Sequence, residues 1–74
     1  MIEQTLDVTG LKCPLPILRA KKALAQLQTD DVLTVLATDA GAPDDFAAFC
    51  RQTGHQLLQS SAQDGVFTLV VKHK

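Results

Sequence analysis

LDVTGLKCPLPILRAKKAL, residues 6–24, contains the change in hydrophobic period from which the fold can be predicted. Up to Thr9, polar and apolar residues alternate, which is typical of a strand over residues 3–9. After Gly10, the apolar residues step by three and four positions, which predicts a helix from Pro14 to about Leu27. Proline suits the first position of a helix, because its missing N–H would have had no partner there.

The rest of the chain predicts one more helix and three more strands. Residues 32–38 are β-branched or apolar at nearly every position, which indicates a strand covered on one face and partly on the other. Pro43 opens a second short helix, which Gly54 ends. A hairpin signal, Asp64-Gly65, joins the last two strands. Those strands are predicted over residues 55–63 and 66–72.

The predicted order is therefore β-α-β-α-β-β. Two strand–helix–strand units favour right-handed crossovers, which put both helices on one face of the sheet. The expected fold class is α/β: a two-layer sandwich of a four-stranded mixed sheet and two helices. A chain of 74 residues is expected to form a single domain, residues 1–74, with a core of marginal size.

Composition and charge argue against several classes of protein. A net charge of −1 gives no support to nucleic-acid binding. Glu3 comes early, and no basic region precedes an apolar stretch, so we expect no signal peptide. No apolar run approaches the roughly 18 residues of a membrane helix. We therefore expect a cytoplasmic protein that makes no contact with a membrane.

The two cysteines predict different roles. They form no CxxC motif and have no histidine at ligand spacing, so we expect neither a metal nor a cofactor. Cys50 shares a helix face with Phe46 and Phe49, which favours a core position, with a resolving thiol as the alternative. Cys13 precedes Pro14, at the N-cap or the residue beside it, where the helix dipole is expected to lower its pKa. The alternative for Cys13 is a chance cysteine in a turn.

Several neighbours are expected to support Cys13. The two prolines stiffen the first turn and remove two N–H groups, which leaves Leu15 as the expected donor there. The basic residues are expected to favour the thiolate. The predicted supporting residues are Lys12, Pro14, Pro16, Arg19 and Lys21. Leu15 and Leu18 are candidates for an apolar docking patch, with partial burial under a loop as the alternative.

Other catalytic groups are not predicted. No Asp or His adjoins Cys13 in the sequence to act as a base, and no phosphate-binding loop or aromatic platform is present. His55 and His73 are expected to be structural or solvent-facing, with His73 in a frayed tail. One exposed nucleophile on a small scaffold indicates a carrier, whose larger partners supply the binding pockets.

The sequence resembles the TusA/SirA-like family of small sulfur-carrier proteins over essentially its whole length. The motifs that carry the resemblance include Gly10-Leu11, Cys13-Pro14 with Pro16, Lys21-Lys22, Asp39 and Phe49-Cys50. The resemblance implies the same sandwich fold and a sulfurtransferase of the carrier type, in which Cys13 accepts sulfane sulfur as a persulfide. It also implies a donor, such as a cysteine desulfurase or a rhodanese, and an acceptor, such as a DsrE-like protein or another relay member. Relays in the family serve tRNA thiolation, molybdenum cofactor supply or sulfur oxidation.

The sequence departs from the family pattern in two places, and the first departure leaves the destination of the sulfur open. Leu15 stands between the prolines, where members similar to the tRNA-thiolation branch often carry an acid. Asp39-Ala40-Gly41 replaces the frequent Asp-Pro-Gly, and no chemical role is expected for Asp39. Two other functions remain as alternatives: a non-catalytic redox or regulatory interaction module, and an RNA-contacting domain.

Overall fold

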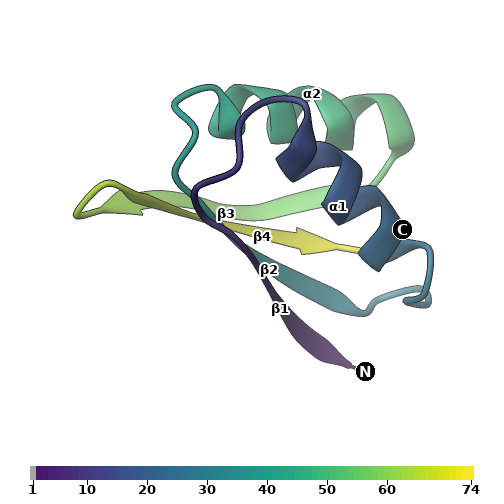
Figure 1. The fold of residues 1–74 in the computed structure, drawn as a ribbon. Coiled ribbons are helices and arrows are strands. Elements are labelled where there is room, and N and C mark those ends of the chain that lie inside the picture. The colour runs from purple at the N-terminus through teal and green to yellow at the C-terminus, as the bar shows by residue number, and fades with distance from the viewer. Residues whose placement is uncertain (1) are drawn as a thin grey trace.

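The six predicted elements are present in the expected order (Figure 1). The computed structural model describes residues 2–74. Its elements are β1 (Glu3–Val8), α1 (Leu15–Leu24), β2 (Val32–Ala37), α2 (Ala42–Thr53), β3 (Gln56–Gln63) and β4 (Val66–Lys72). Both helices lie on the same face of the sheet. The predicted α/β sandwich is therefore confirmed.

The sheet is mixed, with strand order β1-β2-β4-β3. β1 runs parallel to β2, because α1 carries the chain back across the sheet between them. β4 pairs antiparallel with both β2 and β3. Consequently β1 and β3 form the two edges, and the central strands β2 and β4 carry most of the buried strand residues.

The core lies between the sheet and the two helices. Alternate residues of β2 are buried, as the pleat of a strand requires, and the residues between them are half-buried. Phe46 on α2 is the largest fully buried side chain. The fully buried residues around it include Val8, Ala20, Leu33, Val35, Leu69 and Val71. Within residues 2–74, no helix is both long and apolar enough to cross a membrane.

The first helix is shorter than predicted at both ends. Pro14 is the N-cap rather than the first helical residue, and Pro16 lies buried in the first turn. Beyond Leu24 the chain continues as a turn, in which the N–H of Leu27 donates to the Leu24 carbonyl at 3.0 Å. Leu27 is still buried. The apolar stripe therefore identified the packed face correctly but overstated the helix length.

Glycines with a positive φ lie at the predicted turns. Gly54, with φ +90°, ends α2, and its N–H donates to the Cys50 carbonyl at 2.9 Å. Asp64 and Gly65 both have positive φ, as a two-residue hairpin turn requires. Gly10, with φ +81°, donates its N–H to the Thr38 hydroxyl at 2.8 Å. This last bond ties the loop after β1 to the end of β2.

The C-terminal segment is held in place by Asp31 and its neighbours. The nearly fully buried Asp31 side chain accepts hydrogen bonds from the N–H groups of Gln28 at 2.8 Å and Ile2 at 2.9 Å, which lower the pKa of this carboxyl. The N–H of His73 donates to the Asp31 carbonyl at 2.8 Å, and the His73 carbonyl accepts from Asp30 at 3.0 Å. The prediction of a frayed tail at His73 is therefore wrong.

Candidate functional site

Cys13 lies exposed in the loop between β1 and α1, one residue before the N-cap of the helix. This is one of the two positions predicted for it. The Cys13–Pro14 peptide bond is cis. The N–H of Leu15 donates to the Lys12 carbonyl at 2.9 Å. Leu15 is therefore a donor within this turn, as expected, and its partner is the Lys12 carbonyl.

Two carboxylates from a later part of the chain reach this loop. Asp45, in the first turn of α2, and Asp39, in the loop just before that helix, are the two carboxylates that act on the Cys13 thiol and raise its pKa. A Cβ atom added to Gly41 would lie 3.3 Å from an oxygen of Asp39 and 3.7 Å from an oxygen of Asp45. Gly41 also donates its N–H to Asp39 at 3.2 Å. We call Asp39 and Asp45 the acid pair.

The acid pair sets the protonation state of Cys13. The hydrogen bond to Asp45 raises the pKa of the Cys13 thiol, and loss of hydration and the charges of Asp45 and Asp39 raise it further. A negative charge beside a thiol disfavours the thiolate. The prediction of a lowered pKa is therefore wrong. The raised pKa favours the protonated thiol of Cys13 over the thiolate.

The basic residues expected around Cys13 do not converge on it. Lys12 is its chain neighbour, but Arg19 lines a groove between α1 and β1. The ammonium of Lys21 lies 5.9 Å from the ring centroid of Phe49, on the side of α1 that faces α2. None of these cations is among the groups that shift the Cys13 pKa. Their roles in supporting sulfur chemistry stay predictions.

The apolar residues of the first helical turn remain open to a partner. Leu15 is 43% exposed and Leu18 is 50% exposed. Their exposure favours the predicted docking patch over burial beneath a loop. Cys50, in contrast, is only 5% exposed, and burial raises the pKa of its thiol. Cys50 is therefore a core residue, as predicted, and a thiol buried in this way is inert.

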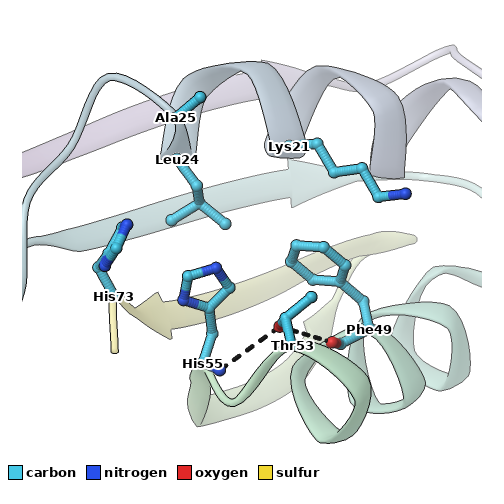
Figure 2. Close-up of a pocket in the computed structure, with 7 residues that line it drawn as sticks. All are labelled: Lys21, Leu24, Ala25, Phe49, Thr53, His55 and His73. Atoms are coloured by element: carbon cyan, nitrogen blue, oxygen red, sulfur yellow. Dashed lines mark hydrogen bonds between the residues drawn. The ribbon is translucent and has the colours of Figure 1, made fainter.

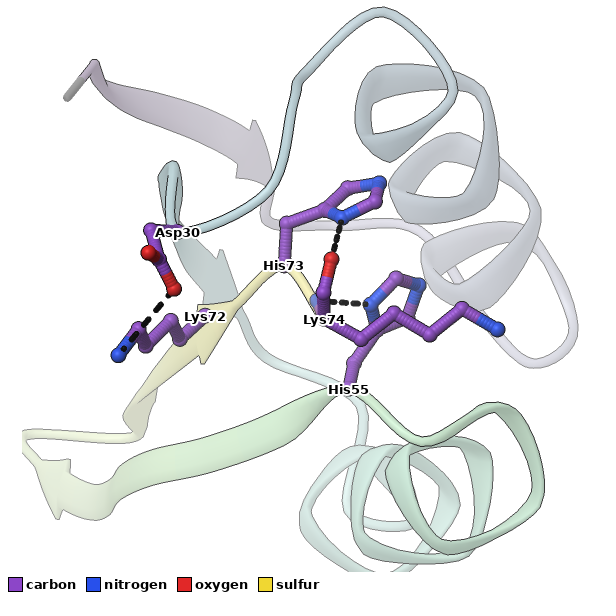
Figure 3. Close-up of polar contacts among 5 residues, drawn as sticks. All are labelled: Asp30, His55, Lys72, His73 and Lys74. Carbon is purple, nitrogen blue, oxygen red and sulfur yellow. Dashed lines mark hydrogen bonds and ion pairs between the residues drawn. The ribbon is translucent and has the colours of Figure 1, made fainter.

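A separate pocket lies away from Cys13, between α1 and α2 (Figure 2). Its volume is about 240 Å³, and it is lined by Lys21, Leu24, Ala25, Phe49, Thr53, His55 and His73. The ring centroids of His55 and His73 are 4.7 Å apart. As Figure 3 shows, Lys74 donates its N–H to Nδ1 of His55 at 3.1 Å, and its carbonyl lies 2.7 Å from Nδ1 of His73. These contacts agree with the structural role expected for both histidines.

Acidification below about pH 6.5 is expected to weaken the fold through His55. Loss of hydration, followed by the charges of His73 and Lys74, lowers the pKa of His55. The unfolded chain then takes up a proton at a higher pH than the folded one, so the free energy of unfolding falls as the pH drops from about 6.5 to the lowered value. Urea unfolding between about pH 7 and pH 5.5 should show this slope, and His55→Gln should reduce it. An equal slope in the variant would contradict the assignment.

Replacement of Asp45 by asparagine is expected to lower the pKa of Cys13. Asp45→Asn removes the charge and the strongest acceptor beside the thiol, so the thiolate fraction at neutral pH should rise. The rate of alkylation by iodoacetamide, measured against pH, reports this change as a midpoint displaced to lower pH. Asp44→Asn is the matched control, because Asp44 shares the first turn of α2 and is not among the groups that shift the Cys13 pKa. Identical profiles for wild type and Asp45→Asn would contradict the role of the acid pair.

The fold and the site together define a class of protein: a small α/β domain that presents one accessible thiol on a loop at an edge of its sheet. A family model described as "Sulfurtransferase TusA" matches residues 4–73. The chain therefore belongs to the TusA family. Family membership indicates a role in sulfur transfer, in which a carrier interacts with sulfur donor and acceptor proteins.

Individual relatives agree with this family. The chain is 81% identical over 74 residues to a protein of Neisseria meningitidis serogroup A named "Putative sulfur carrier protein", with both chains fully covered. It is 50% identical over 70 residues to the sulfur carrier protein TusA of Allochromatium vinosum, which covers 95% of this chain and 92% of that protein. A solved structure of a SirA-like protein from Desulfitobacterium hafniense matches with a TM-score of 0.84 and 32% identity. That match covers 93% of this chain and 95% of the other.

Proposed function

We propose that this protein carries sulfane sulfur as a persulfide on Cys13, from a donor protein to an acceptor protein. The observation that carries the proposal is the contrast between the two thiols. Cys13 is exposed on a loop that the active site of another protein can reach, whereas Cys50 is enclosed in the core. The family indicates sulfur transfer, and the accessibility of Cys13 supports its choice as the carrier atom.

Loading is a thiol–disulfide type of exchange. The Cys13 thiolate attacks the terminal sulfur of a donor Cys–S–SH, the donor S–S bond breaks, and the donor thiolate leaves. Cys13 then holds S–SH, and the sulfur keeps its oxidation state. Unloading repeats the step, because an acceptor thiolate attacks the terminal sulfur and the Cys13 thiolate leaves. No external oxidant or reductant is consumed.

The acid pair makes this exchange depend on a partner. In the free carrier, Asp45 and Asp39 raise the pKa of Cys13, which disfavours a thiolate that could react with other electrophiles. A partner that brings positive charge to the site offsets the charges of Asp39 and Asp45 and favours the thiolate. The carrier is therefore a sulfurtransferase that turns over only with its partners.

The partners proposed for this relay are those that the family resemblance implies. A cysteine desulfurase or a rhodanese supplies a protein persulfide, and a DsrE-like protein or another relay member offers an acceptor thiol. The same step at Cys13 would serve tRNA thiolation, molybdenum cofactor supply or sulfur oxidation, so the acceptor determines the destination. These exchanges fit a reducing cytoplasm, in which thiols stay free.

A loading assay tests the proposal. The protein is incubated with cysteine and a cysteine desulfurase, or with thiosulfate and a rhodanese, and its intact mass is measured. A gain of one sulfur atom, removed by a thiol reductant and mapped to the peptide that contains Cys13, is the expected result. A redox or regulatory module would gain no sulfur, so the absence of a gain with either donor would refute the carrier function.

A further inference from the structure

β1 has a free edge with unpaired backbone groups. It is the terminal strand of the sheet, and within residues 2–74 no strand lies on its outer side (Figure 1). The carbonyl of Ile2 accepts a hydrogen bond from the N–H of Val32 at 2.8 Å. Residues two apart in a strand direct their backbone N–H and C=O groups to the same side, so Ile2, Gln4, Leu6 and Val8 direct theirs toward β2. The residues between them, Glu3, Thr5 and Asp7, direct theirs away from the sheet. Such an edge can accept another strand.

A cationic groove lies beside this edge, on the helix side of β1. Its volume is about 570 Å³, and it is lined by Gln4, Leu6, Arg19, Lys22, Ala23 and Gln26. Leu6 and Ala23 contribute half-buried apolar surface. Arg19 and Lys22 are exposed, and within the described residues neither forms an ion pair. The groove thus offers apolar contact and two positive charges to anything that pairs with β1.

On the face of the sheet away from the helices, β1 carries negative charge, in contrast to the cationic groove. Gln4, Leu6 and Val8 face the helices, so Glu3 and Asp7 project from the open face of the sheet, where both are exposed. Side chains that stand opposite one another on paired strands interact directly. A strand that pairs with β1 should therefore carry acidic residues on its helix side and polar or basic residues on its other side.

A second copy of this chain does not fit this description. Two β1 strands paired antiparallel about a twofold axis would place both copies of α1 on the same face of a continuous sheet. The Arg19 and Lys22 side chains of the two copies would then approach one another without a carboxylate between them. Like charges placed in this way oppose association. The complementary occupant is a strand of another protein.

We propose that an extended segment of the sulfur donor, acidic on alternate residues, pairs with β1 and directs the donor persulfide to Cys13. This inference rests on the carrier function proposed above. β1 ends at Val8, and the loop that follows leads to Cys13 at the start of α1, so a strand along β1 ends beside the thiol loop. Addition of a strand supplies affinity through the backbone and specificity through alternate side chains.

Loading rates with a cysteine desulfurase and cysteine test the docking mode. Thr5→Pro removes an outward N–H, a change that a free edge tolerates, and Thr5→Val is its control because it keeps that N–H. Lys22→Glu reverses a groove charge, and Arg51→Glu makes the same charge change on the exposed side of α2. Thr5→Pro and Lys22→Glu should load about tenfold more slowly than wild type. Both controls should match wild type, and inorganic polysulfide, which needs no docking, should load all four variants equally.

Amide exchange gives a second measurement that needs no variant. The Thr5 N–H of the wild type should exchange rapidly in the free protein and more slowly in the presence of the desulfurase. If the wild type gains no sulfur from the desulfurase, the carrier function itself fails. If the wild type loads but Thr5→Pro and Lys22→Glu load equally fast, or Thr5 exchange is unchanged, the docking inference is overturned.

Discussion

Cys13→Ser is expected to abolish sulfur loading completely, whereas Cys50→Ala should load at the wild-type rate. A serine hydroxyl stays protonated at neutral pH and cannot form the S–S bond of a persulfide, so the variant has no carrier atom. The Cys50 thiol is only 5% exposed and its pKa is raised by burial, so it cannot replace Cys13 as the nucleophile. The measurement is the intact mass after incubation with cysteine and a cysteine desulfurase.

The stability of both variants must be measured, because a destabilised fold could also reduce sulfur loading. Cys13 is exposed, so its replacement by serine should leave the urea midpoint unchanged. Alanine is preferred at Cys50, because serine would bury a hydroxyl in the core. Sulfur on the Cys13→Ser protein, or loss of loading in a folded Cys50→Ala protein, would assign the carrier atom to Cys50 and contradict the proposal.

The fold was predictable because its signals are local. The change of period after Gly10, the helix end at Gly54 and the Asp64-Gly65 hairpin each act within a few residues. The predicted length of α1 was wrong for a related reason. Leu27 packs on the same core as the helix, so it continues the apolar stripe although its backbone already belongs to a turn. Periodicity shows which side of the chain is buried, and the helical hydrogen bonds can end before the apolar stripe does.

The electrostatics of the site were not predictable from residues adjacent in sequence. Lys12 and Arg19 are near Cys13 along the chain, but the charges that act on the thiol come from Asp39 and Asp45. Topology could have identified them. β1 and β2 are parallel, so the loops that follow their carboxyl ends lie at the same end of the sheet. This brings Asp39 toward Cys13. A predicted parallel pair is thus a better guide to charge neighbours than distance along the chain.

Phe46→Ala is expected to cause the largest loss of stability among single core substitutions. Phe46 is fully buried beneath α2, and its ring makes an edge contact with Phe49, with centroids 6.5 Å apart. Removal of a buried phenylalanine side chain costs about 3–5 kcal/mol. A chain of 74 residues has a total stability of about 4–11 kcal/mol at the usual value per residue. The substitution should therefore remove a large part of the free energy of unfolding.

The same substitution should also disturb the site, because Phe46 anchors the turn of α2 that carries Asp45. Urea unfolding, followed by circular dichroism, measures the loss. Leu18→Ala is the control, since this leucine is 50% exposed and its truncation should cost about 1 kcal/mol or less. A cost for Phe46→Ala no greater than that of Leu18→Ala would contradict the assignment of Phe46 to the centre of the core.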